Sequence, residues 1–192
     1  MFTYIPKKSK EIYDNIIAHR GYHYFYPENT IMAYLEALKR NFAIELDIRM
    51  TMDGYIVCMH DRYTKRLLGK RGKTSNMTLK QLNNYTVKGT IQKVPLFEDV
   101  LKLIKGNVPL LIEIKGFLNK KFNRNLFYYM ANYDGKFYFH AKNIFTYFIL
   151  RSIWKDRVFF ILNPFRKRFN FIKSKYYRNL KKIDYNYNLN IT

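Results

Sequence analysis

Short apolar segments alternate with amphipathic segments along most of the chain. "IIAH" (residues 16–19) is a short apolar run followed by Gly21, a pattern typical of a buried strand. "TIMAYLEALKRN" has apolar residues at helical spacing, and Asn29 or Thr30 can serve as its N-cap. "AIELDIRM" and "IVCMH" flank Asp53-Gly54, a strong hairpin signal, so these two segments are predicted to pair antiparallel.

The alternation continues after the hairpin. A polar loop (67–76) precedes helical patterns over 78–84 and 96–105, and Pro109 and Gly116 bound the strand "LLIEI". The pattern then predicts helix 120–133, strand 136–140, helix 143–154, strand 157–162, a basic helix 166–182 and a last strand 183–189. Strands that alternate with helices imply a mainly parallel sheet. A closed eight-stranded barrel usually needs about 250 residues, so we expect one α/β domain over 1–192, an incomplete TIM-type barrel with about six of eight strands.

Positive charge is concentrated in the second part of the chain. The formal net charge is +21, and residues 117–192 hold 16 Lys and Arg against 3 Asp and Glu. Such a surface attracts nucleic acid, an anionic membrane or an acidic substrate. A generally lysine-rich composition explains it equally well. The basic run 166–182 has an apolar stripe at helical spacing (Phe169, Ile172, Tyr176, Leu180), so a barrel helix with a solvated basic face accounts for it. Nucleic acid is therefore not the expected partner, and peripheral contact with an anionic membrane stays open.

The remaining global features point to a protein of the cytoplasm. Cys58 is the only cysteine, so no intrachain disulfide can form, which suits a reducing compartment. The first 15 residues lack the apolar centre of a signal peptide, and "IFTYFILRSIW" is too short to cross a bilayer.

Acidic side chains recur at alternate positions in two of the predicted strands. Glu45 and Asp47 share one strand face, and Glu113 and Lys115 repeat the arrangement on another strand. A solvated face or simple ion pairs would explain either pair alone. Both pairs together, beside two histidines, favour a site where three carboxylates hold Mg²⁺ or Ca²⁺.

Cationic and imidazole groups fall at the ends of the same predicted strands. His19 and Arg20 end the first strand, and His60 ends the hairpin return, roughly opposite Asp47 unless the register slips by one residue. Two imidazoles can exchange protons, while Arg20, Lys115 and a metal can neutralise phosphate oxygens. These groups are suited to cleaving a phosphodiester.

At these residues the chain resembles the glycerophosphodiester phosphodiesterase family. The resemblance rests on "AHRG", "PENT", "ELDIRMTMDG", "VCMHD" and "IEIKG", in that order, and covers roughly residues 16–116. It implies a barrel of the phosphodiesterase kind and a role in lipid metabolism. The expected reaction is metal-dependent hydrolysis of glycerophosphodiesters, or of glycerol-phosphate polymers, to glycerol phosphate and an alcohol.

The resemblance also implies a role for each residue. Glu45, Asp47 and Glu113 would be the metal ligands, for Mg²⁺ or Ca²⁺. His19 and His60 would form the acid–base pair, with Arg20 and Lys115 binding the substrate phosphate. Glu28 and Asp61 belong to the motifs as well. We expect Glu28 near the site and Asp61 in a supporting task such as holding the loop or the backbone.

The resemblance weakens after Gly116, where the chain has "FYFHAKN" in place of a Ser-Phe-Asn-like segment and lacks the usual Trp-Thr segment. Two alternatives therefore stay open: a lysophospholipase D or sphingomyelinase-D-like enzyme, and a truncated, non-catalytic remnant. Other residues are given structural tasks. His140 is expected to be a hydrogen-bonded structural histidine and His23 to lie at the rim. The aromatic helices after residue 117, and Trp154, are expected to be mostly core.

Overall fold

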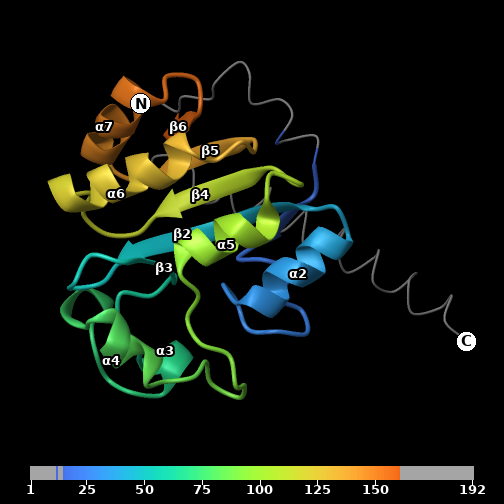
Figure 1. Cartoon of the computed structure of the whole chain (residues 1–192), viewed down its shortest axis with the longest axis vertical. Helices are drawn as coiled ribbons and strands as arrows, with labels where there is room; N and C mark the ends of the chain where they lie inside the picture. Colours follow the sequence, from blue (N-terminus) through green and yellow to red (C-terminus); the bar gives the residue numbers. More distant parts are fainter. Residues whose placement is uncertain (1–11, 13–14, 161–192) are drawn as a thin grey trace, which may run out of the picture.

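The computed structural model describes residue 12 and residues 15–160, and its centre is one sheet with helices packed against it (Figure 1). The strands are β1 (Ile17–His19), β2 (Ala43–Met50), β3 (Ile56–Cys58), β4 (Leu110–Ile114), β5 (Phe137–Ala141) and β6 (Val158–Phe160). The main helices are α2 (Ile31–Lys39), α5 (Phe97–Ile104), α6 (Lys120–Ala131) and α7 (Ile144–Ile153). The predicted basic helix and last strand lie outside the described residues.

Five of the strands run parallel, in the order β1-β2-β4-β5-β6, and β3 pairs antiparallel with β2. A helix lies in the connection between successive parallel strands: α5 between β2 and β4, α6 between β4 and β5, and α7 between β5 and β6. Parallel neighbours need such crossover connections. The expected α/β fold, an incomplete TIM-type barrel, is confirmed for the described part of the chain. The parallel carboxyl ends of the strands gather at one edge, where a barrel assembles its site.

The two faces of the sheet differ in character because side chains alternate along each strand. The outer face carries Ile44, Leu46, Ile112 and Phe139, which pack with buried residues of the surrounding helices into the main core. The other face has an apolar layer near the amino ends, made of Ile12, Leu111, Tyr138 and Phe159. Above that layer the same face carries buried acidic and imidazole groups, so the site rests on an apolar floor.

Helix α2 begins as its sequence predicts. The side chain of Thr30 accepts a hydrogen bond from the Ala33 amide, and its backbone is extended, so Thr30 is the N-cap. Ala33, Tyr34 and Ala37 are buried against the sheet. The "PENT" segment therefore starts a helix, and its Asn29 side chain reaches Asp47 of β2.

The hairpin has the predicted antiparallel pairing in a different register. Met50 pairs with Ile56, so five residues form the connection, centred on Asp53. The Asp53 carboxylate accepts hydrogen bonds from Thr51 Oγ1 and from the Leu79 amide, which favours this wider loop. The Met59 amide consequently donates to the Asp47 carbonyl, so the slip of one residue that the sequence left open occurs, and His60 lies one residue beyond the position opposite Asp47.

Residues 57–94 form a small lobe with its own core, seen at one end of the sheet in Figure 1. The segment predicted as a polar loop (67–76) includes the last two residues of α3 (Lys65–Leu68) and the 3₁₀ helix η2 (Thr74–Asn76), and α4 (Leu79–Asn83) follows. Leu67 and Leu68 are buried here because they pack against Val57, Met59 and Leu82. Two leucines in a basic segment were too weak a pattern to predict this helix.

The aromatic helices after residue 117 are less buried than the sequence suggests. In α6 and α7 the buried positions include Phe122, Leu126, Tyr147 and Leu150. Trp154 packs against the main core as expected, whereas several other aromatic side chains are exposed: Phe117, Phe127, Tyr128, Phe145 and Phe148. The prediction that these helices are mostly core is therefore only partly right. In the part of the chain that the structure describes, no helix combines the length and the apolar character needed to cross a membrane.

Candidate active site

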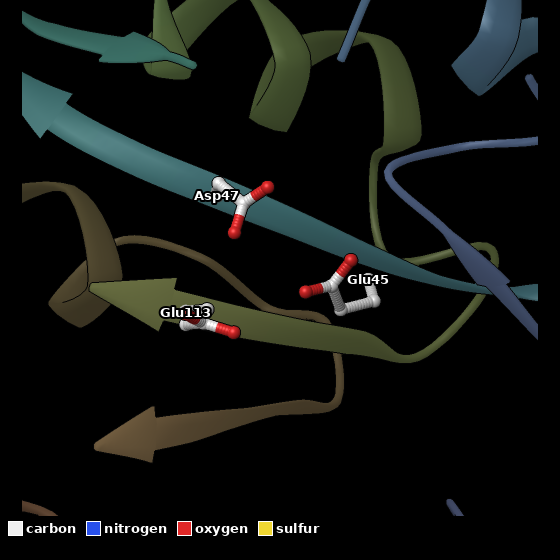
Figure 2. Close-up of side chains that lie close together, drawn as sticks. All are labelled: Glu45, Asp47 and Glu113. Atoms are coloured by element: carbon white, nitrogen blue, oxygen red, sulfur yellow. The ribbon is translucent and has the colours of Figure 1, made fainter. Parts of the chain in front are cut away.

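Three buried carboxylates come together on the inner face of β2 and β4 (Figure 2). Glu45 and Asp47 project from β2, and Asp47 stands in register with Glu113 of β4. One oxygen from each lies within 4.8 Å of the other two. The in-register row continues to His140 on β5. The parallel pairing alone therefore aligns an aspartate, a glutamate and a histidine across three neighbouring strands.

The first strand ends in a tight turn that aims His19 and Arg20 at these carboxylates. Arg20 and Gly21 both have left-handed backbones, with φ of 57° and 77°. A Cβ at Gly21 would lie 2.8 Å from the Ala33 carbonyl carbon, so only glycine fits between β1 and α2. The Arg20 amide then donates to Glu45 Oε2 at 2.9 Å, and His19 Nε2 lies 3.8 Å from the same oxygen.

The Arg20 guanidinium joins the carboxylate row to the rim of the site. Its Nε lies 3.3 Å from Asp47 Oδ2, and its Nη1 donates to Glu28 Oε1 at 2.9 Å. Glu28 also pairs with Arg66 of α3. Burial alone would raise the pKa of Glu28, but the two arginines lower it. Glu28 thus lies near the site, as expected, where it holds Arg20 between two acids.

Asn29 of the "PENT" segment fixes the orientation of Asp47. Its Nδ2 donates to Asp47 Oδ2 at 3.0 Å, and its Oδ1 accepts from the Asp47 amide and the Tyr34 hydroxyl. Asn29 is 1% exposed and has φ of 53°, a conformation that asparagine tolerates better than most residues. The sequence suggested only a capping task for Asn29.

His60 is held by its own neighbour in the chain. His60 Nδ1 lies 2.8 Å from Asp61 Oδ1, and Arg66 Nε donates to the other Asp61 oxygen. Burial lowers the pKa of His60, against the opposing effect of Asp61. Burial would raise the pKa of Asp61, but Arg66 and His60 bring it to about 2. Asp61 therefore holds the His60 imidazole rather than the backbone. This is a supporting task, as the sequence suggested, but with a different partner.

Glu113 is surrounded by three cationic or imidazole groups. Lys115 and Lys142 both place Nζ against Glu113 Oε1, and His140 Nδ1 lies 3.2 Å from Oε2. Burial alone would raise the pKa of Glu113, yet His140 and the two lysines hold it well below its usual range. Lys115 also lies 3.2 Å from Asp47 Oδ1. Burial would lower the pKa of Lys115, whereas Asp47 and Glu113 raise it.

The carboxylates present suit a hard divalent cation. Glu45, Asp47 and Glu113 supply only oxygen ligands from rigid strands, and oxygen ligands are what Mg²⁺ and Ca²⁺ prefer. Among the described residues, Asp47 Oδ1 accepts no hydrogen bond of normal geometry, although it is fully buried. Lys115 Nζ lies 3.2 Å from this oxygen, and a divalent cation held by the three carboxylates would give it a further partner. The geometry therefore fits the three ligands that the sequence suggested.

Most site residues that the sequence suggested converge, and several further ones join them. His140 is hydrogen-bonded as expected, but its partner is Glu113 in the site itself. His23 lies at the rim, with its ring centroid 6.2 Å from that of His19. Lys142 and Arg66 also join the site, although neither was predicted from the sequence. "His-x-Lys" at 140–142 repeats the strand-end spacing of "Glu-x-Lys" at 113–115, and that repeat would have identified Lys142.

Comparison with known proteins agrees with this geometry. The model of the glycerophosphoryl diester phosphodiesterase family matches residues 19–181. The chain belongs to this family. YhdW of Bacillus subtilis (strain 168), whose name places it among the glycerophosphodiester phosphodiesterases, is 34% identical over 149 residues. That match covers 74% of this chain and 60% of YhdW, so the chain spans less than two thirds of that relative.

Solved structures of the family share the fold. The glycerophosphodiester phosphodiesterase of Thermotoga maritima has a TM-score of 0.60 at 27% identity, covering 73% of this chain and 58% of its own. An Oleispira antarctica phosphodiesterase in complex with sn-glycerol-3-phosphate has a TM-score of 0.68 at 19% identity, covering 82% and 71%. The likeness to the second structure establishes the fold alone.

Proposed function

We propose that this chain hydrolyses glycerophosphodiesters to glycerol phosphate and an alcohol, using a divalent metal held by Glu45, Asp47 and Glu113. The convergence of these buried carboxylates with two imidazoles at one edge of a parallel sheet carries the proposal. Family membership supports it, and so does the product bound to the Oleispira antarctica phosphodiesterase. Mg²⁺ and Ca²⁺ both fit an all-oxygen ligand set on this scaffold.

The first proton transfer belongs to His60. Asp61 engages Nδ1, which directs Nε2 toward a substrate hydroxyl, and the lowered pKa keeps the ring neutral at pH 7. His60 takes the proton of the glycerol 2-hydroxyl while the oxygen of that hydroxyl forms a bond to phosphorus. The bond from phosphorus to the alcohol oxygen breaks, and His19, which lies beside Glu45, gives that oxygen a proton.

The first step leaves a cyclic phosphate, and water then opens it by attack on phosphorus, with the two histidines exchanging their roles as acid and base. Neutral His19 takes a proton from water, and protonated His60 returns one to the 2-oxygen, so both rings regain their starting states. Arg20 and Lys115 bind the phosphate oxygens throughout, since both project from strand ends beside the carboxylates. The divalent cation, when bound, neutralises charge that develops on the same oxygens.

The lysophospholipase D or sphingomyelinase-D-like alternative is weaker for this chain. Choline is a cation, and the cavity walls beside His60 and Lys115 carry arginines and lysines. Tyr24 and Phe25 are exposed in the aromatic loop and could meet a lipid tail. Peripheral contact with an anionic membrane rested mainly on the basic run 166–182, which lies outside the described residues.

Hydrolysis of glycerophosphoglycerol by the purified chain, with Mg²⁺ or Ca²⁺, tests the proposal. His19→Ala and His60→Ala should each lower turnover by at least about a hundredfold and melt close to the parent. Tyr24→Ala, at the exposed rim, is the matched control and should keep most of the activity. Full activity in either histidine variant would exclude the acid–base pair. A parent that melts cooperatively and releases no glycerol phosphate would instead favour the non-catalytic alternative.

A further inference from the structure

Two neighbouring cavities adjoin the candidate active site and share one wall, formed by Arg49 and Arg62, here called the arginine wall. The first cavity, of about 490 Å³, also includes Lys115 in its lining and so opens directly beside the phosphate-binding position. The second, of about 730 Å³, includes His60. The arginine wall therefore lies next to residues of the proposed acid–base and phosphate-binding groups.

The lining of the first cavity is cationic, and of its four charged side chains only Lys115 is paired with carboxylates. Four side chains carry positive charge (Arg49, Arg62, Lys73, Lys115), and no described residue that lines the cavity has a carboxylate. Within residues 15–160, Arg49, Arg62 and Lys73 form no ion pair with an acid. Cations gathered in a concave surface produce a focused positive potential. The other three cations of the cavity differ in this respect from Lys115 and Lys142, which face Glu113.

Arg49 is fixed in a way that suits binding. Its Nε and Nη2 both donate to the His60 carbonyl, at 3.0 and 2.6 Å, and its Nη1 lies 3.5 Å from the Lys115 carbonyl. These contacts are to neutral oxygens, so none of them pairs the guanidinium with a carboxylate. They also tie the arginine wall to the backbone of two proposed catalytic-site residues. An anion on this wall would therefore lie at a fixed place relative to the scissile phosphate.

We propose that the arginine wall and Lys73 form a second anion subsite, which binds a phosphate one glycerol unit away from the scissile phosphate. The preferred substrates are then glycerophosphodiesters with a second phosphate, whether small molecules or glycerol-phosphate chains. The identity of the substrate in this proposal rests on the proposed function, whereas the residues of the subsite are separate from the proposed catalytic residues. Arginine forks and an ammonium are the groups that recognise phosphate best.

The test compares bis(glycerophospho)glycerol, which has two phosphodiesters, with glycerophosphoglycerol, which has one. After correction for the two scissile bonds, kcat/KM should be about tenfold higher for the larger substrate, as one charge-assisted contact predicts. Arg62→Gln with Lys73→Gln should reduce this ratio to within about twofold and leave kcat on glycerophosphoglycerol near the parent value. Lys70→Gln with Lys80→Gln removes the same charge from exposed positions outside both cavities and should keep the ratio.

Calorimetry in EDTA separates this inference from the proposed function. Without turnover, the parent should bind bis(glycerophospho)glycerol about tenfold more tightly than glycerophosphoglycerol, and the Arg62→Gln/Lys73→Gln variant should lose the difference. Equal affinities in the parent, or the same loss in the Lys70→Gln/Lys80→Gln control, would overturn the subsite. Hydrolysis of neither substrate would overturn the proposed function alone, since the binding comparison still decides the subsite. Glycerol-phosphate chains of increasing length, assayed alongside, distinguish a polymer from a small substrate: a further gain beyond two phosphates indicates the polymer.

Discussion

Replacing Asn29 with alanine should be among the most destabilising changes at the candidate site. The amide donates to a buried carboxylate, Asp47, a bond worth about 1.5–3 kcal/mol. The change also removes the Asn29 oxygen as an acceptor for the buried Tyr34 hydroxyl, at a cost of about 1–3 kcal/mol. The left-handed backbone at position 29 adds about 1 kcal/mol for alanine. Because neighbouring losses overlap, we expect about 4 kcal/mol in total.

Urea unfolding of the metal-free protein in EDTA measures this loss directly. A loss of about 4 kcal/mol corresponds to a fall of about 8–16 °C in Tm for a chain of this size. Tyr34→Phe is the matched control, since it removes only the hydroxyl donor and should cost about 1 kcal/mol. If Asn29→Ala costs no more than Tyr34→Phe, then Asn29 does not hold Asp47 and the account of the "PENT" segment is wrong.

Three further predictions follow from other contacts. Lys142→Met should tighten Ca²⁺ binding about tenfold in calorimetry, because the Lys142 ammonium competes with a cation for Glu113; unchanged affinity would remove Lys142 from the site. The Asp61 pKa of about 2, against an ordinary 3.8, means that its pairing stabilises the fold above about pH 4 and is lost as pH falls toward 2. Arg66→Gln should therefore flatten the parent's loss of stability over that acid range, and identical slopes would contradict the pairing. Phe122→Ala should cost about 3–5 kcal/mol in urea unfolding, since Phe122 is 1% exposed. Phe148→Ala, at an exposed position, should change the free energy of unfolding by no more than about 0.5 kcal/mol. Equal losses in the two variants would show that Phe122 of α6 is not buried as described.

Much of the architecture could be predicted because apolar and polar residues alternate with the period of a strand or a helix along most of the chain. The alternation of Glu45 and Asp47 with isoleucine and leucine fixed a strand face, and the parallel register then brought Glu113 alongside. The hairpin register was off by one residue because the length of the loop depends on side-chain contacts of Asp53 with Thr51 and Leu79. The Asp53–Leu79 contact joins residues 26 positions apart, so no local pattern in the sequence predicts it.

The supporting groups were harder to predict than the ligands. Asn29 acts through a buried amide, Tyr34 and the Asp47 backbone, an arrangement that exists only after α2 packs on β2. Arg66 lies on a four-residue helix whose two buried leucines gave too weak a period. The exposed aromatic residues of α6 and α7 show the opposite error. Apolar composition indicates core on average, but it does not decide which face of a helix is covered.

Metal titration of the EDTA-treated chain tests the central claim most directly. Hydrolysis of glycerophosphoglycerol and the heat of metal binding are followed on one preparation, with Mg²⁺ and with Ca²⁺, for the parent and for Glu113→Gln. The account predicts no turnover in EDTA, recovery that saturates at the same metal concentration as binding, and a shift of both curves by at least about tenfold in Glu113→Gln. Turnover that persists in EDTA, or binding unchanged by Glu113→Gln, would contradict a metal-dependent site built on Glu45, Asp47 and Glu113.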